Sequence, residues 1–321
     1  MVTFGCQLPT REATPETLRL QAQYAEDLGF DTVWVIDHIV IPRRVRSVYP
    51  YAADGVSTFI PDQPLLEPLA ALNFLAGCTH RVRLGTSVLI IPYRPPLLTA
   101  KQLATLDVLS GGRLILGAGA GWMEEEFQAL GLDTFARRGA VTDEYLRLFK
   151  ALWTEETPVF HGEYVQVADL GFAPKPVQKP HPPIWIGGHT FPALRRAARF
   201  GDGWLPLGNL PPAVFTPTAL REQIALLREL TRSAGRPEGA VTVSFAGAVS
   251  FGAVADADRR PLGGQPEQIA ADLCAYRDAG VSDFLLMFTH LQSGVADRLK
   301  AMERFVRDVL PLVPREERSR W

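Results

Sequence analysis

The feature that most constrains the fold is a repeated alternation of short apolar runs with segments of helical periodicity. Runs rich in Val, Ile, Leu and aromatic residues each precede a segment whose apolar positions recur every three or four residues. Parallel strands joined by helices are buried on both faces, which accounts for continuous apolar runs. The strands are expected at residues 4–9, 31–39, 82–91, 114–116, 183–187, 203–207, 241–249 and 283–288.

Each expected strand is followed by an expected helix. The helices are expected at residues 14–28, 67–78, 96–110, 139–153, 191–200, 213–233, 266–279 and 295–309. Eight strand–helix units that close on themselves form a TIM barrel, and 321 residues suit a single domain of this kind. A doubly wound open sheet is the alternative.

Two segments interrupt the alternation. Residues 40–64 contain four prolines together with Tyr49, Tyr51 and Phe59. A connection of this length in a compact domain is usually a lid or a binding loop, so we expect a lid-like insertion there. Residues 157–181 are expected to insert a small hairpin. The chain is otherwise predicted to be one barrel domain over residues 1–321.

A glycine-rich stretch follows the fourth expected strand. Gly117, Gly119 and Gly121 are spaced two apart, and glycine lets the backbone approach a bound group closely. The dinucleotide fingerprint fails because position 122 is Trp, and no Lys-Ser/Thr completes a P-loop. The stretch therefore either holds a flat or anionic ligand against bare backbone or is a tight turn whose glycines serve packing.

Function in a TIM barrel lies where the strands end, at the carboxyl-terminal face. These ends combine a carboxylate, histidines, a Trp and glycine turns, a set that can hold a planar ring with a phosphate. The strand-end residues are 7–8, 37–38, 86–88, 117–122, 187–189, 206–208, 246–249 and 287–290.

Asp37 and His38 are the most informative pair, because only one of two adjacent side chains easily points into the barrel mouth. A histidine there can exchange a proton near neutral pH. A histidine that caps a backbone carbonyl is the alternative. Gly187, Gly188 and His189 precede a helix whose N-terminus could bind an anion, although a plain packing turn remains the alternative.

Several functional classes are disfavoured. A formal net charge of -2 offers no basic field for nucleic acid, and no signal peptide or apolar run long enough to span a membrane occurs. The three cysteines are far apart, as in a reducing compartment, and no histidine or cysteine spacing indicates a metal. We expect a cytoplasmic protein without a metal, a nucleic-acid partner or a membrane partner.

Taken together, these motifs resemble the luciferase-like monooxygenase superfamily, and more narrowly its branch that depends on the deazaflavin coenzyme F420. The resemblance covers residues 3 to about 310. Its principal motifs are Leu109–Arg113, Gly117–Trp122 and Glu125–Phe127, supported by Trp34–His38, Tyr49–Tyr51, Leu84–Leu89, Trp185–His189 and Gly201–Trp204.

The resemblance implies a barrel with coenzyme F420, or alternatively FMN, at its mouth. It places Asp37 and His38 beside the ring as catalytic residues, with His38 exchanging the proton. It also implies a non-prolyl cis peptide between Ser87 and Val88 behind the ring. The cofactor-binding residues implied are Asp37, His38, Thr86, Ser87, Val88, Gly119, Gly121, Trp122, Glu125 and, around a phosphate, Gly187, Gly188 and His189.

The function expected from this resemblance is hydride transfer between coenzyme F420 and a small organic substrate, by a homodimer. Trp122 stands where sugar-phosphate-oxidising relatives have a Glu, and the aromatic residues favour an apolar or aromatic substrate. One alternative is an FMN-dependent monooxygenase that uses molecular oxygen and a partner reductase. Another, of a different class, is a non-catalytic coenzyme-binding protein.

Overall fold

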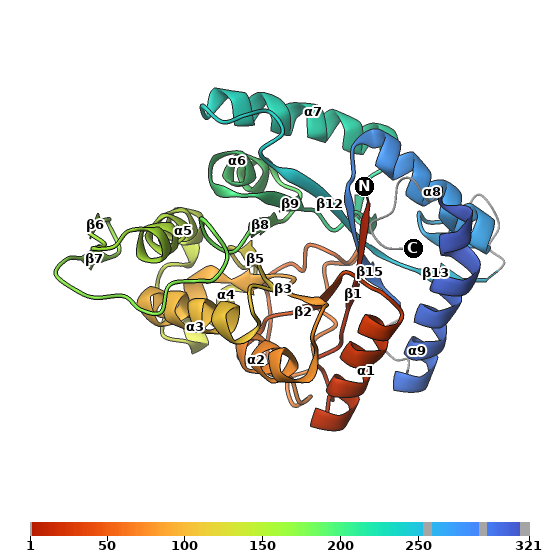
Figure 1. The fold of residues 1–321 in the computed structure, drawn as a ribbon, viewed down its shortest axis with the longest axis horizontal. Coiled ribbons are helices and arrows are strands. Elements are labelled where there is room, and N and C mark those ends of the chain that lie inside the picture. Colours follow the sequence, from red (N-terminus) through yellow and green to blue (C-terminus); the bar gives the residue numbers. More distant parts are fainter. Residues whose placement is uncertain (1, 253–258, 289–293, 315–321) are drawn as a thin grey trace.

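Eight parallel strands close into a barrel in the computed structural model, which describes residues 2–252, 259–288 and 294–314 (Figure 1). Each strand pairs with the next along the chain, β3 pairs with β5, and β15 returns to β1. The predicted TIM barrel is therefore confirmed. Its strands are β1 (Thr3–Gln7), β2 (Thr32–Val35), β3 (Arg83–Thr86), β5 (Leu114–Gly119), β8 (Ile184–Gly187), β9 (Gly203–Leu205), β12 (Thr242–Ala248) and β15 (Asp283–Met287).

Helices surround this barrel, and many of them begin at a proline, whose missing N–H costs nothing in the first turn. Thr14, Glu67 and Thr216 cap three of them by accepting a backbone N–H at the helix start. No described helix is long and apolar enough to cross a membrane. The helices are α1 (Pro15–Asp27), α2 (Pro68–Cys78), α3 (Pro96–Leu109), α4 (Glu124–Ala129), α5 (Arg138–Thr154), α6 (Phe191–Phe200), α7 (Pro217–Ser233), α8 (Pro266–Ala279) and α9 (Val295–Arg304).

The interior of the barrel is filled by two tryptophans from strands on different sides. The rings of Trp34 and Trp185 have centroids 5.4 Å apart, and both belong to one apolar cluster with Leu285. Neighbouring strands carry glycine where these rings lie. A Cβ on Gly85 would be 2.2 Å from Trp34 Cε3, and one on Gly203 would be 2.5 Å from Trp185 Cδ1. The barrel is thus a packed core below its mouth.

The expected strand at 82–91 is divided. A cis peptide bond between Ser87 and Val88 separates β3 from β4 (Leu89–Ile90), and a 3₁₀ turn follows at Ile91–Tyr93. Thr86 and Ser87 interrupt the apolar residues of this segment, but its periodicity did not predict two strands. Because β4 also pairs with β5, the bulge stays part of the barrel wall.

Two expected helices also differ from their predicted bounds. The helix expected at 213–233 begins only at Pro217, since proline inside a helix would clash with the carbonyl four residues earlier. A small hairpin, β10 (Asn209–Leu210) with β11 (Ala213–Val214), occupies the residues before it. The helix expected at 295–309 passes from α9 into a π-helical turn at Phe305–Val309 and a 3₁₀ turn at Leu310–Leu312.

The two insertions have different structures. Residues 157–181 contain the expected hairpin, β6 (Phe160–His161) with β7 (Gln166–Val167). Residues 40–64 form an irregular segment without helix or strand, which we call the lid segment. The remaining short elements are a 3₁₀ turn at Phe135–Arg137 and the pair β13 (Ser250–Phe251) with β14 (Gly263–Gly264).

Candidate functional site

The carboxyl ends of neighbouring strands place the candidate residues on one rim of the barrel. Parallel pairing sets Val35 of β2 opposite Thr86 of β3. It likewise sets Ala118 of β5 opposite Ile186 of β8. The segments that follow these residues therefore begin at the same end of the barrel. They contain Asp37, His38, Ser87, Val88, Gly119, Gly121, Trp122, Glu125, Gly187, Gly188 and His189.

The bulge after β3 explains two of the glycines. The Ser87–Val88 peptide is cis, as the resemblance implied. A Cβ on Gly119 would lie 2.4 Å from Val88 Cγ2, and a Cβ on Gly187 would lie 2.6 Å from Val88 Cγ1. Glycine is needed at both positions to make room for the Val88 side chain. The packing interpretation of the glycine-rich stretch thus has a structural basis at Gly119.

Thr86 and the loop after β5 form the next part of the rim. The buried Thr86 hydroxyl donates a 2.7 Å hydrogen bond to the Gly117 carbonyl oxygen. Gly121 has φ +85°, a left-handed conformation that favours glycine. The turn brings Trp122 near His38, with ring centroids 6.2 Å apart.

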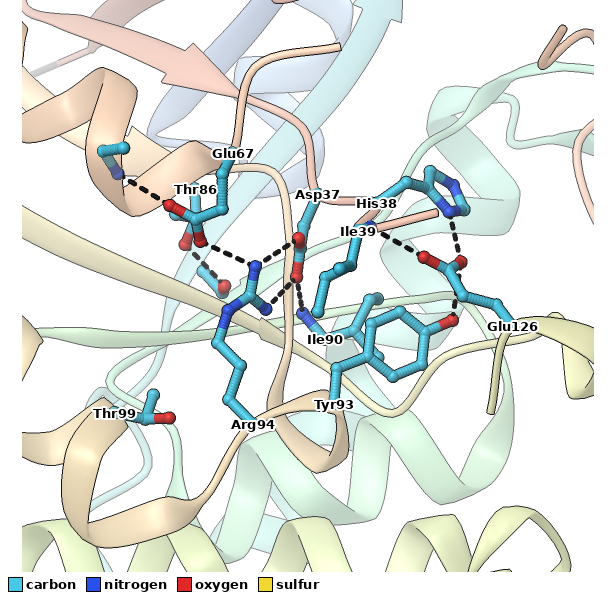
Figure 2. Close-up of polar contacts among 12 residues, drawn as sticks. Asp37, His38, Ile39, Glu67, Thr86, Ile90, Tyr93, Arg94, Thr99 and Glu126 are labelled. Carbon is cyan, nitrogen blue, oxygen red and sulfur yellow. Dashed lines mark hydrogen bonds and ion pairs between the residues drawn. The ribbon is translucent and has the colours of Figure 1, made fainter. Parts of the chain in front are cut away.

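Asp37 is the centre of a buried ion pair (Figure 2). Arg94 donates to both of its carboxylate oxygens, at 2.7 and 2.8 Å, and also to Glu67 at 2.7 Å. The Ile90 backbone N–H donates to Asp37 at 2.8 Å. Burial raises the pKa of the Asp37 carboxyl, and the Arg94 guanidinium opposes this. Asp37 therefore joins the end of β2 to β4 and to the starts of α2 and α3.

His38 belongs to a second network, built around Glu126 of α4. His38 Nδ1 lies 2.6 Å from Glu126 Oε2, and the Tyr93 hydroxyl donates to the same oxygen at 2.9 Å. The backbone N–H groups of Ile39 and Val40 donate to Glu126 Oε1 at 2.7 and 3.2 Å. Burial raises the pKa of Tyr93, so its phenol keeps the proton that it donates. Figure 2 shows this network beside that of Asp37.

Glu125, the neighbour of Glu126, holds the lid segment. Its Oε1 accepts the backbone N–H groups of Arg46 and Ser47 at 2.7 and 3.2 Å. The Ser47 hydroxyl in turn accepts the backbone N–H of Glu124 at 3.0 Å. The structure thus places the Glu125 side chain on the lid segment.

Three aromatic side chains of the lid segment, which we call the aromatic collar, lie across the rim. The collar consists of Tyr49, Tyr51 and Phe59. Each contacts a ring on a strand end, so the collar joins three separate parts of the rim. The ring centroids are 4.1 Å apart for Phe59 and His38, 5.1 Å for Tyr49 and Trp122, and 5.6 Å for Tyr51 and His189.

The turn after β8 has the features of an anion site. Gly188 has φ +105°, and His189 Nδ1 is buried without a hydrogen-bond partner among the described residues. Thr190, the N-cap of α6, makes no side-chain hydrogen bond to the helix start. Burial lowers the pKa of His189, so its imidazole is neutral at pH 7. The unpartnered ring nitrogen thus belongs to the residue that directly precedes the N-cap of α6.

Two further expectations concern the remaining strand ends and metals. His290, at the end of β15, lies outside the described residues. Among residues 2–252, 259–288 and 294–314, no group of three His, Cys, Asp or Glu side chains could hold a metal ion.

Glu126, Tyr93 and Arg94 were missed from the sequence. Glu126 was named only as part of the Glu125–Phe127 motif, without a role of its own. Yet Met123, Glu126 and Phe127 occupy one helical face, and all three are buried. A carboxylate on an otherwise apolar face is the signal that could have identified it, because buried charges need partners.

Comparison with known proteins identifies relatives. The model of the luciferase-like monooxygenase family matches residues 1–262. An uncharacterized protein of Mycobacterium tuberculosis is 36% identical over 215 residues, which cover 67% of this chain and 71% of the relative. The F420-dependent glucose-6-phosphate dehydrogenase of Amycolatopsis mediterranei is 31% identical, with 64% and 57% covered.

Another relative covers more of the chain. The FMNH(2)-dependent dimethylsulfone monooxygenase of Pseudomonas putida is 27% identical over 94% of this chain and 89% of its own length. Among solved structures, monooxygenase RslO1 from Streptomyces bottropensis has a TM-score of 0.75 at 21% identity, covering 96% of this chain and 99% of that one. This last likeness concerns the fold.

Proposed function

The chain belongs to the luciferase-like monooxygenase family, and on that premise we propose that it transfers a hydride between coenzyme F420 and a small organic substrate. The F420-dependent dehydrogenase relative supports this choice, and the FMNH(2)-dependent relative supports the flavin alternative. When bound, the deazaflavin ring would supply the hydride chemistry. The protein would bind the coenzyme and the substrate, orient them toward each other and exclude competing reactions.

The residues of the rim fit such a coenzyme. The α6 terminus with Gly188 and His189 would hold its phosphate, because free N–H groups and the helix dipole favour an anion there. The unpartnered Nδ1 of His189 offers one more hydrogen bond. The bulge at Val88 and the ring of Trp122 would lie beside its flat ring.

The observation that carries the proposal is the position of His38 at the rim. Its Nδ1 is fixed by Glu126, and no described residue makes a hydrogen bond to its other ring nitrogen, Nε2. Hydride transfer to or from a carbon that bears a hydroxyl or amino group also requires a group that takes or supplies the proton of that O–H or N–H. Nε2 of His38 suits this role. Asp37 would contribute by holding the strand end next to His38, since Arg94 occupies its oxygens.

The substrate is proposed to be apolar or aromatic. The aromatic collar and Trp122 offer flat apolar surfaces next to His38. With the collar across the rim, the lid segment would also exclude water from the reacting groups.

Titration of the purified protein with each coenzyme tests the choice of cofactor. We expect binding of F420, followed by its fluorescence, to be tighter than binding of FMN. Tight binding of FMN alone would instead favour a monooxygenase that uses oxygen and a partner reductase. Binding without any substrate-dependent change in coenzyme absorbance, across a panel of apolar alcohols and ketones, would favour a non-catalytic carrier.

Replacement of His38 tests the proton carrier. His38→Ala is expected to lower kcat by roughly 10²- to 10⁴-fold, the usual contribution of a general acid or base. Coenzyme affinity should fall much less than kcat, because the phosphate turn is untouched. An unchanged kcat would remove His38 from the reaction.

We also propose a homodimer, as the resemblance implied. Sedimentation equilibrium at micromolar concentration measures the mass directly. A measured mass equal to that of one chain at every concentration would reject the homodimer.

A further inference from the structure

Glu126 is a carboxylate enclosed by hydrogen-bond donors. Its side chain is fully buried, and two backbone N–H groups, one phenol and one imidazole nitrogen surround its two oxygens. Among the described residues, its ion pairs include His38 and no lysine or arginine. Donors of this kind compensate a buried carboxylate for the water that it has lost.

This arrangement dictates where the proton of His38 lies. An ionised carboxylate can only accept hydrogen bonds, so a nitrogen 2.6 Å from Glu126 Oε2 must carry hydrogen. That nitrogen is Nδ1. A neutral imidazole protonated at Nδ1 has its lone pair at Nε2, and a carboxylate that fixes a histidine in this way is a known device for proton acceptors.

We propose that Glu126 is the positioning residue that holds His38 as the Nδ1–H tautomer, so that Nε2 accepts the proton which the substrate releases. The inference rests on the proposed function, and it sets the role of His38 as a base in the oxidising direction. In that step the substrate O–H or N–H bond breaks, its proton bonds to Nε2, and Nδ1 keeps its own. The C–H bond on the same substrate carbon breaks as well, its hydride would pass to the oxidised coenzyme of the proposed function, and a C=O or C=N double bond forms. The imidazolium formed would then face the Glu126 carboxylate.

The same carboxylate also links His38 to the lid segment. Oε1 holds the N–H groups of Ile39 and Val40, which connect His38 to the lid, while Oε2 holds the imidazole. Tyr93 fixes Oε2 from another element, so the carboxylate has little freedom to turn away. Glu126 thereby orients both the ring and the backbone that carries it.

Nitrogen NMR of the full chain labelled with ¹⁵N-histidine tests the proposal without coenzyme or substrate. At a pH where the imidazoles are neutral, the His38 signals should show a protonated Nδ1 and an unprotonated Nε2. They are assigned by their loss in His38→Gln. A dominant Nε2–H tautomer in the unaltered protein would overturn the proposal.

Variants then separate positioning from folding. In Glu126→Gln we expect the His38 pattern to change to a mixture of tautomers or to the opposite one. Tyr93→Phe keeps the carboxylate and should keep the Nδ1–H pattern. The exposed Glu124→Gln, on the same helical turn, is the matched control and should leave the spectrum unchanged. An unchanged His38 pattern in a folded Glu126→Gln protein would also overturn the proposal.

Kinetics provide the second readout once a substrate is known. Glu126→Gln should lower kcat roughly 10²-fold or more and leave KM within a few-fold, whereas Glu124→Gln should change neither. Should Gln prevent folding, Glu126→Asp retains the charge and is expected to keep the Nδ1–H tautomer. Failure to bind either coenzyme would refute the proposed function, while the tautomer would still be decided by NMR.

Discussion

At the residue scale, Asp37 is expected to matter for stability. Its side chain is fully buried and that of Arg94 is 10% exposed, so Asp37→Ala leaves a buried guanidinium with Glu67 as its remaining carboxylate. Breaking a buried pair on one side costs about 3–5 kcal/mol. Urea unfolding should show a loss of this size in the free energy of unfolding.

The chain contains a matched control for this measurement. Arg43 and Asp62 form a two-bond pair of the same kind, at 2.7 and 2.8 Å, with side chains 75% and 72% exposed. Solvent screens such a pair, so Asp62→Ala should change the free energy of unfolding by less than about 1 kcal/mol. Equal losses at Asp37 and Asp62 would contradict the role of burial.

Asp283, near the opposite end of the barrel from the rim, predicts a dependence of stability on pH. Burial raises the pKa of the Asp283 carboxyl to about 6. Hydrogen bonds of 2.6 Å from the hydroxyls of Thr3 and Ser244 act in the opposite direction and lower this pKa. A raised pKa means that the folded state binds the proton more tightly than the unfolded state. The contribution to stability is therefore complete below the unfolded value near 4 and is lost as pH rises through about 6.

Asp283→Asn, which does not titrate, isolates this contribution. Relative to the variant, the unaltered protein should lose about 1–2 kcal/mol of unfolding free energy between pH 5 and pH 7.5. Urea unfolding of both proteins at the two pH values measures the difference. Parallel behaviour of the two proteins over this range would show that Asp283 does not titrate there.

The sequence predicted some residues of the candidate site but not their hydrogen-bond partners. Asp37 and His38 were identified because they end an apolar strand. Their partners Arg94 and Glu126 lie on other elements, and no local pattern reports such distant pairs. The resemblance implies that Glu125 binds the cofactor, and the contacts of its carboxylate with the lid backbone could not be predicted from the sequence.

At the scale of elements, three glutamates on helices each hold a loop by accepting its backbone N–H groups. Glu26 and Glu144 are buried, and Glu125 is partly buried. Glu26 of α1 accepts backbone N–H groups from residues 80–82. Glu144 of α5 does the same for residues 163–165 in the hairpin insertion, and Glu125 of α4 for residues 46–47 of the lid segment. Helices that cover the barrel therefore also fix the loops that leave it.

Glu144→Ala tests this anchoring. The hairpin should lose protection of the Tyr164 and Val165 amides in hydrogen exchange, because both donate to Glu144, at 2.8 and 2.9 Å. Barrel amides should keep their protection. Glu163→Ala, which removes an exposed pair with Arg137, is the control and should leave these two amides protected.

Element boundaries were predictable where a proline or a cap marks the start. Pro15, Pro68 and Pro96 begin their helices close to the expected residues. Pro217 carries the same signal, yet the preceding apolar residues extended the prediction backwards to 213. The division of strand 82–91 came from the resemblance alone, because periodicity does not indicate which peptide is cis.

At the scale of the whole molecule, closure of the barrel depends on small residues facing large rings. Gly85→Ala would place a Cβ 2.2 Å from the fully buried Trp34 ring, which cannot move without displacing Trp185. Overpacking of this kind costs about 1–3 kcal/mol or more, so thermal unfolding should occur at a clearly lower temperature.

Gly77→Ala is the matched control. Gly77 lies in α2, and a Cβ there would meet no atom within 4 Å. Alanine should raise stability by roughly 0.5–1 kcal/mol through helix propensity. Destabilisation by both variants would show that the loss at Gly85 does not come from Trp34.

The barrel itself was predictable because eight apolar runs with intervening helices leave few other solutions. The side chains that fill the interior of the barrel could not be predicted in the same way. Trp34 and Trp185 were visible as strand residues, but their meeting requires knowledge of which strands face each other across the barrel.

The opposite directions taken by the side chains of Asp37 and His38 have a consequence for variation. In a library that substitutes both positions and scores abundance and turnover separately, changes at 37 should remove the protein from the soluble fraction. Changes at 38 that keep a hydrogen-bond donor for Glu126, such as His38→Gln, should lower turnover far more than they lower abundance. Selection would thus act on two adjacent codons for different reasons, at position 37 for the stability of the fold and at position 38 for catalysis.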